Sequence, residues 1–148
     1  MNDDDRGGRG MRFLTKYLAF WVVIVFGAFP AALGALRVYC CRGCGVVTLK
    51  ESRPTSYGCP ASGTHTWHEV GIPGDLVYLC VSCRNVVAVQ RQPASHGCPA
   101  AATHRWAYLG RRGRRHYQCS RCRVSVLLES LPRSGSCPEG GSHSWRSL

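Results

Sequence analysis

The sequence predicts a small β-rich, metal-stabilised protein in which three tandem modules follow one N-terminal hydrophobic helix. Three observations support this prediction: a 39-residue repeat that begins at Tyr39, ten cysteines in a chain of 148 residues, and an uncharged run between Lys16 and Arg37. A unit of about 40 residues is near the size at which a hydrophobic core alone no longer stabilises a fold. Each module therefore needs a metal ion, disulfides or its neighbours.

The repeat defines which residue types make up a module. Every copy reads Y-x-C-x-x-C, then C-P, then H-x-W, and no insertion or deletion shifts the copies against one another. Each copy thus supplies three cysteines and one histidine, which are the four ligands of a tetrahedral zinc site. The predicted metal ligands are Cys41, Cys44, Cys59, His65, Cys80, Cys83, Cys98, His104, Cys119, Cys122, Cys137 and His143.

Zinc accounts for this repeat better than disulfides do. Three cysteines per copy leave one thiol that would have to pair outside its module, and disulfides give the repeated histidine no role. We therefore predict three Zn²⁺ ions per chain, with a secreted structural protein held by disulfides as the alternative. Covalent haem attachment requires a histidine directly after C-x-x-C, where this chain has Gly45, Arg84 and Arg123.

The N-terminal region divides into a charged tail, residues 1–16, and an apolar segment, residues 17–36. The segment YLAFWVVIVFGAFPAALGAL carries no charge, and its length suits a membrane-spanning helix. The same residues also fit a secretory signal peptide with a basic region before it and a cleavage site after Gly34. We predict a single-pass membrane protein, with secretion after signal-peptide cleavage as the alternative.

Within each module, aliphatic runs on either side of C-x-x-C predict two strands, and the tryptophan begins a third. The expected strands are 38–41, 46–49, 76–79, 86–89 and 124–128, with third strands that end at residues 70, 109 and 148. The three modules then span residues 38–71, 76–110 and 115–148. Turn signals at residues 71–75 and 110–115 predict hairpins that join each third strand to the first strand of the next module.

The repeated tyrosine and tryptophan are expected to form a small core beside each metal. The alternative is a stacking platform for bases or a carbohydrate. One residue of each type per module is about what a domain of this size needs for its own core.

The combination of Y-x-C-x-x-C with a downstream G-C-P resembles the rubredoxin-like zinc-ribbon superfamily. The resemblance covers residues 39–148 at the level of knuckles and strands, but C-P-x-x-x-x-H replaces the second C-x-x-C and Ser136 replaces the glycine in the third copy. Zinc ribbons serve in nucleic-acid machinery and as protein-interaction modules. The resemblance therefore implies a fold more than a single function.

Four protein ligands close each predicted site, whereas a catalytic zinc keeps one position open for water or substrate. We therefore predict that the chain is not an enzyme, has no small-molecule substrate, and acts as a binding or scaffold module for a protein partner. His68, His96 and His116 lie outside the repeat and are expected at the surface or in turns. Cys40 is expected as a free buried thiol, with palmitoylation beside a membrane or an intermolecular disulfide as alternatives.

The chain is basic, with a formal net charge of +11, and the surplus is mostly arginine. Arg111, Arg112, Arg114 and Arg115 surround Gly113 in one predicted turn. Arginine prefers phosphate and carboxylate partners, so this cluster predicts contact with nucleic acid or with anionic lipid headgroups. A solvated turn without a ligand is the alternative.

Overall fold

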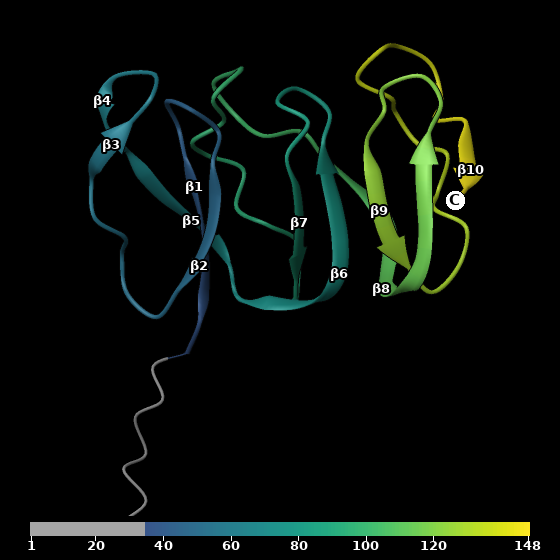
Figure 1. The fold of residues 1–148 in the computed structure, drawn as a ribbon, viewed down its shortest axis with the longest axis horizontal. Coiled ribbons are helices and arrows are strands. Elements are labelled where there is room, and N and C mark those ends of the chain that lie inside the picture. Colours follow the sequence, from purple (N-terminus) through teal and green to yellow (C-terminus); the bar gives the residue numbers. More distant parts are fainter. Residues whose placement is uncertain (1–34) are drawn as a thin grey trace, which may run out of the picture. The chain divides into compact units, whose positions relative to one another are not determined.

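The computed structural model describes residues 35–148, and all its regular elements in that range are β-strands (Figure 1). The strands are β1 (Arg37–Cys41), β2 (Val47–Lys50), β3 (Tyr57–Cys59), β4 (Gly63–Thr64), β5 (Trp67–Gly71), β6 (Pro73–Cys80), β7 (Val86–Val89), β8 (Trp106–Cys119), β9 (Ser125–Leu128) and β10 (Trp145–Ser147). The β-rich prediction is confirmed for this range. The predicted helix over residues 17–36 lies outside the described residues, apart from its last two positions. From residue 35 onwards, the chain contains no helix with the length and apolar character of a membrane span.

One strand pattern occurs three times. In each copy a central strand leads into C-x-x-C and has two antiparallel neighbours. Strand β1 lies between β2 and β5, and β6 lies between β7 and the first part of β8, residues 106–111. The second part of β8, residues 112–119, lies between β9 and β10. The tryptophan that begins each outer strand lies opposite the first cysteine of its own knuckle, as in the Cys41–Trp67 pair. The three-strand prediction is therefore confirmed, with small differences at the strand ends.

Strand β8 belongs to two modules at once. Its residues 106–111 pair with β6, and its residues 112–119 pair with β9 and β10. The predicted hairpin at residues 110–115 is therefore wrong, because the chain stays extended there and enters the last module without reversing. The hairpin predicted at the first junction is also wrong, since only Ile72 separates β5 from β6 and the two strands pair with other partners.

Hydrogen bonds from the following module hold the extended chain at both junctions. The backbone N–H of Gln90 donates to the Ile72 carbonyl (2.9 Å), and the equivalent N–H of Glu129 donates to the Arg111 carbonyl (3.0 Å). Backbone polar groups at the junction are thus satisfied without a turn. This is the physical reason why glycine-containing stretches with turn-like composition do not form hairpins here.

Gly74 and Gly113 occupy equivalent positions at these junctions, and each permits a close approach of two backbones. A Cβ atom on Gly74 would lie 2.5 Å from the backbone nitrogen of Gln90. A Cβ atom on Gly113 would overlap the backbone nitrogen of Glu129 and lie 2.5 Å from the carbonyl carbon of Leu128. Real Cβ atoms do not come this close to a backbone, so only glycine fits at these positions.

Two apolar clusters fill the junctions, and the repeat relates their members to one another. Each cluster combines the first and third strands of one module with the first and second strands of the next. The cluster of the first junction contains Val38, Cys40, Val70, Val87 and Val89, with Tyr78 and Trp106 packed against it. The cluster of the second contains Val77, Leu79, Leu109, Tyr117, Val126 and Leu128. Burial between neighbours therefore supplies the apolar core that one module of this size lacks.

The outer modules depart from the repeat at the positions that would face a further neighbour. The last copy carries half-buried Gln118 where the first two copies have buried Cys40 and Leu79. The first copy carries half-buried Thr48 and exposed Lys50 where later copies have buried valine or leucine. Polar outer faces of this kind are typical of terminal repeats.

We expect Gly113→Ala to lower the free energy of unfolding by about 2–4 kcal/mol, because the added methyl group overlaps the backbone of the neighbouring strand. Chemical denaturation of the metal-loaded protein measures this change. Gly135→Ala is the matched control, since a Cβ atom there meets nothing within 4 Å and the change should stay within about 0.5 kcal/mol. Equal stability of the two variants would contradict the close approach at the junction.

Candidate metal centres

Each C-x-x-C pair closes a tight knuckle between the first and second strands of its module. In the first copy the backbone N–H of Gly45 donates to the Cys41 carbonyl (2.9 Å), and the N–H of Cys41 donates to the Val46 carbonyl (3.0 Å). Both bonds recur in the other copies. The residue after the second cysteine has a positive φ every time: 75° at Gly45, 65° at Arg84 and 62° at Arg123. Since two of these residues are arginines, the knuckle imposes this backbone conformation whether or not glycine is present.

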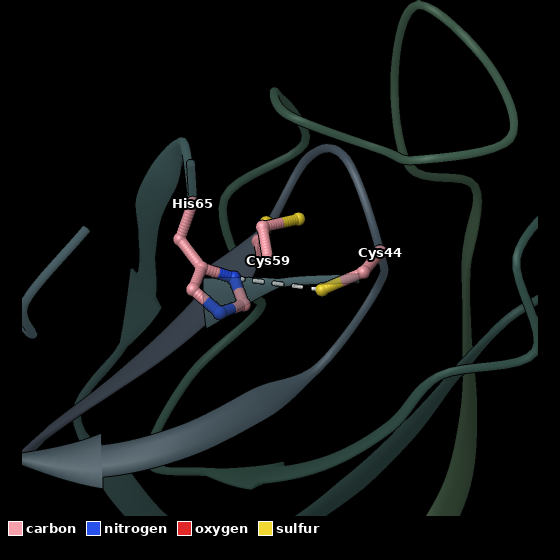
Figure 2. Close-up of side chains that lie close together, drawn as sticks. Cys44, Cys59 and His65 are labelled. Carbon is pink, nitrogen blue, oxygen red and sulfur yellow. Dashed lines mark hydrogen bonds between the residues drawn. The ribbon is translucent and has the colours of Figure 1, made fainter. Parts of the chain in front are cut away.

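The structure brings each predicted quartet of ligands together. In every module the donor atoms of the three cysteines and the histidine lie within 4.8 Å of one another. The quartets are Cys41, Cys44, Cys59 and His65; Cys80, Cys83, Cys98 and His104; and Cys119, Cys122, Cys137 and His143. Figure 2 shows how Cys44, Cys59 and His65 of the first quartet converge, with Nδ1 of the histidine turned toward a sulfur atom. Three candidate metal-binding sites therefore lie along the repeat.

The distances within the quartets fit the edges of a metal tetrahedron. The second cysteine of each knuckle has its Sγ atom 3.5, 3.5 and 3.6 Å from Nδ1 of its histidine, and Cys41 Sγ lies 4.0 Å from Cys59 Sγ. A metal with bonds of about 2.3 Å to sulfur and about 2.0 Å to nitrogen has sulfur–nitrogen edges of about 3.5 Å and sulfur–sulfur edges of about 3.8 Å. The residues present therefore fit a tetrahedral cation.

Several neighbours orient the histidine of each quartet, as the second copy illustrates. The backbone N–H of His104 donates to the Ser95 carbonyl (2.5 Å). Its ring stacks on Trp106, with centroids 4.5 Å apart and planes inclined by 20°. The indole Nε1 in turn donates to the Ala94 carbonyl (2.9 Å). The same stack and the same indole bond recur in the other two copies, which explains why tryptophan repeats together with the ligands.

The repeated aromatic side chains are part of the core. Tyr39, Trp67 and Tyr117 are buried, and Tyr78, Trp106 and Trp145 pack against the junction clusters. The core prediction is therefore confirmed, and these rings do not form an exposed platform for stacking.

The ring nitrogen that faces away from the sulfurs lacks a partner in two of the copies. Nε2 of His104 and Nε2 of His143 are buried without a hydrogen bond. A metal-binding histidine commonly donates its second N–H to a carboxylate or carbonyl group that orients the ring. Here the tryptophan stack takes over that orienting role.

Burial and backbone donors move the thiol pKa values of one knuckle in opposite directions. Burial tends to raise the pKa of Cys119, but the backbone N–H of Cys122 and the ring of His143 outweigh it and leave the pKa at about 6. Burial raises the pKa of Cys122 to about 11, and the adjoining sulfur of Cys119 adds to this effect. Three sulfurs this close do not all ionise without a compensating positive charge. A bound cation supplies that charge, and its binding releases protons.

No two cysteines form a disulfide within residues 35–148, the range that contains all ten of them. Cys41 and Cys59 are 4.0 Å apart at sulfur, about twice the length of an S–S bond. The geometry of the repeat therefore supports metal binding and lends no support to the disulfide alternative.

Cys40 lies in the first junction and is 1% exposed, so its prediction as a free buried thiol is confirmed. The side-chain amide of Asn85, from the second module, donates to its Sγ atom (3.3 Å) and to the Gly45 carbonyl (2.8 Å). Burial raises the pKa of the Cys40 thiol to about 11, although the Asn85 amide opposes this change. Palmitoylation and an intermolecular disulfide both require an accessible sulfur. Nothing in the sequence pattern pointed to Asn85, because the other copies have valine there.

The four clustered arginines lie exposed on β8, and no hairpin tip presents them as a group. Arg111 lines one groove together with Tyr108 and Arg133. Arg112 lines a different groove together with His116. None of the four takes part in an ion pair within residues 35–148. Arg111 and Arg112, although adjacent in the sequence, therefore lie in different grooves.

The three histidines outside the repeat have different environments. His96 and His116 are exposed, as expected. His68 is half-buried, and its ring meets that of His96 edge to face with centroids 5.3 Å apart. Gly97 has a φ of 82°, and a Cβ atom there would lie 2.5 Å from Cγ of His68. The expectation of a surface or turn position is therefore wrong for His68, which packs between the first two modules.

Comparison with known proteins returned no match to a family model, a curated protein or a solved structure. The resemblance to zinc ribbons accordingly rests on the knuckles and strands alone.

His104→Ala removes one of four donors from the middle quartet, so we expect the metal content to fall from about three to about two ions per chain, or that site to lose its metal first on chelation. His96→Ala is the matched control, because this exposed ring lies outside the quartet and its loss should leave the metal content unchanged. Elemental analysis of both purified variants decides the matter. If both variants lost metal equally, the ligand assignment would be wrong.

Proposed function

We propose that this chain is a non-catalytic zinc protein whose three modules form a binding scaffold for a protein partner, anchored in a membrane by residues 17–36. The observation that carries the proposal is the convergence of three cysteines and one histidine in every module. This donor set suits zinc, which combines thiolate and imidazole ligands in tetrahedral geometry and has no redox chemistry. The zinc would neutralise the buried thiolates and connect the two halves of each module.

The closed ligand set supports a structural role for the metal. Three sulfurs and one nitrogen occupy all four positions of a tetrahedron, so neither water nor substrate would reach the ion in the folded module. A cation held in this way supplies folding free energy and does not activate a nucleophile. We therefore place the function on the outer surface of the modules.

The exposed surface supports a binding role. Within residues 35–148, only two ion pairs form, Arg37–Glu69 and Arg84–Glu139, although fifteen of the lysines and arginines lie in this range. Most of the basic side chains are therefore available to a partner. Arginine next to apolar surface is enriched in protein interfaces.

The membrane part of the proposal rests on the uncharged run before Arg37. We expect the full chain to remain in the membrane fraction after extraction with alkaline carbonate, because a spanning helix is not removed by the loss of ionic contacts. Mass spectrometry of the same material should find the N-terminal tail intact. Release into the soluble fraction, with a mature chain that begins near Ala35, would support the secreted alternative instead.

The purified protein should contain about three zinc ions per chain, and a strong chelator should unfold residues 35–148, because metal affinity contributes directly to folding free energy in small metal domains. Elemental analysis together with circular dichroism measures both effects. Re-addition of zinc under reducing conditions should restore the strand signal. A metal-free protein that keeps its fold in the chelator would refute the structural role of zinc.

A further inference from the structure

The junction between the second and third modules carries a groove of about 400 Å³ that the metal sites do not use. Four strands contribute to it: β6, β7, β8 and β9, which Figure 1 shows in the middle and last modules. The residues that line it are Val77, Val86, Ala88, Arg112, His116, Ser125, Val126 and Leu127. A volume of this size is large enough for a bulky side chain and the backbone next to it.

The groove combines an apolar wall with cationic side chains. Five of its eight lining residues are aliphatic, and Leu127 is 53% exposed to solvent. Arg112 and His116 are also exposed, and neither forms an ion pair within residues 35–148. An apolar surface that is bordered by unpaired cationic groups complements a ligand that is itself apolar and acidic.

The first junction lacks the basic side chains that border this groove, so the repeat itself does not require them. The lining positions of the groove correspond to positions one repeat earlier, which lie at the first junction. There, Leu49 stands where the groove has Ala88, Pro73 where it has Arg112, and Val77 where it has His116. The first junction is thus uncharged at the two basic positions and has a larger side chain at the position of Ala88, whereas its own Ala88 stands where the groove has Leu127. The two basic side chains are therefore particular to the second junction.

We propose that this groove binds an acidic peptide segment of a partner protein. A bulky apolar side chain of the peptide lies against Val86, Ala88 and Leu127, and a neighbouring carboxylate binds the guanidinium of Arg112. This inference rests on the proposed binding role and names the chemical class of the partner.

The lining residues favour a peptide over nucleic acid or lipid. The eight lining residues include one aromatic ring, the His116 imidazole, whereas single-stranded nucleic acid is usually bound by several aromatic rings on which successive bases stack. The planar guanidinium group of Arg112 pairs with a carboxylate as well as with a phosphate, so the preference for a peptide rests on the apolar wall of the groove. Strands β7 and β9, which both line the groove, are edge strands that each pair with one neighbour only, β6 and β8 respectively. Arg111 and Arg112 line two different grooves, which does not suit a continuous phosphate backbone.

The test uses the full chain, loaded with zinc and solubilised in detergent, and a phage-displayed library of random hexapeptides. We expect selection to enrich aspartate or glutamate within two positions of leucine, isoleucine or phenylalanine. The selected peptide is then titrated against the wild type and against three variants. Ala88→Leu introduces the side chain found at the equivalent position of the first module and fills the groove. Arg112→Gln removes the cation, and Arg91→Gln is the control, because Arg91 carries the same charge but lies outside this groove.

We expect Ala88→Leu and Arg112→Gln each to weaken peptide binding about tenfold, while Arg91→Gln leaves it unchanged. No enrichment of acidic peptides, or equal binding by the wild type and Ala88→Leu, would overturn the inference. Preferential binding of phosphatidylserine vesicles or of a single-stranded RNA with the same dependence on Arg112 would also overturn it. Zinc content is measured on the same samples. A chain that holds three zinc ions but binds no peptide would overturn the groove proposal alone. A chain that is folded without metal would overturn the proposed zinc function.

Discussion

The interaction on which the rest of this structure depends is the convergence of three thiols and one imidazole on a single point in every module. Sulfur atoms this close repel one another once they ionise, and burial makes their ionisation more costly. A cation at the centre reverses that balance. Strands of three to five residues, such as β1 and β10, have too little apolar surface of their own to hold two separate chain segments together. A cation bound by the quartet would join the knuckle to the segment that carries C-P and histidine.

The second constraint is that the modules share their cores. Leu79 and Leu109 come from the second module and pack against Val126 and Leu128 of the third. Strand β8 continues this sharing in the backbone, because its two parts belong to different sheets of three strands. Metal binding within a module and apolar packing between modules are therefore complementary, and the loss of one centre is expected to weaken its neighbour.

The sequence was sufficient to predict the grouping of three cysteines and one histidine, the presence of three strands in a module and the burial of the repeated aromatics, because all of these recur with one spacing. It was not sufficient to predict the junctions. Gly110 and Gly113 have the composition of a turn, but hydrogen bonds from the following module keep this stretch extended. Local propensity cannot reveal such bonds, since their donors lie about 18 residues further along the chain, as Glu129 does relative to Arg111. The role of Asn85 was equally hidden, because it occurs in one copy only.

The three copies differ at some positions and agree at others, and the two kinds of position have different roles. Positions that recur in all three copies build the metal centre and its support. Positions that differ between the copies mark the polar outer faces and the groove beside Arg112 and His116. Since these departures lie on the surface or at a junction, they are where the chain can differ from a plain repeat without losing its fold.

X-ray absorption spectroscopy at the zinc edge of the purified, zinc-loaded protein reads the ligand set of the three centres. We expect one average first shell of three sulfur atoms at about 2.3 Å and one nitrogen at about 2.0 Å, with no bound water. A shell dominated by oxygen and nitrogen, or one of four sulfurs, would contradict the assignment of three cysteines and one histidine to every centre.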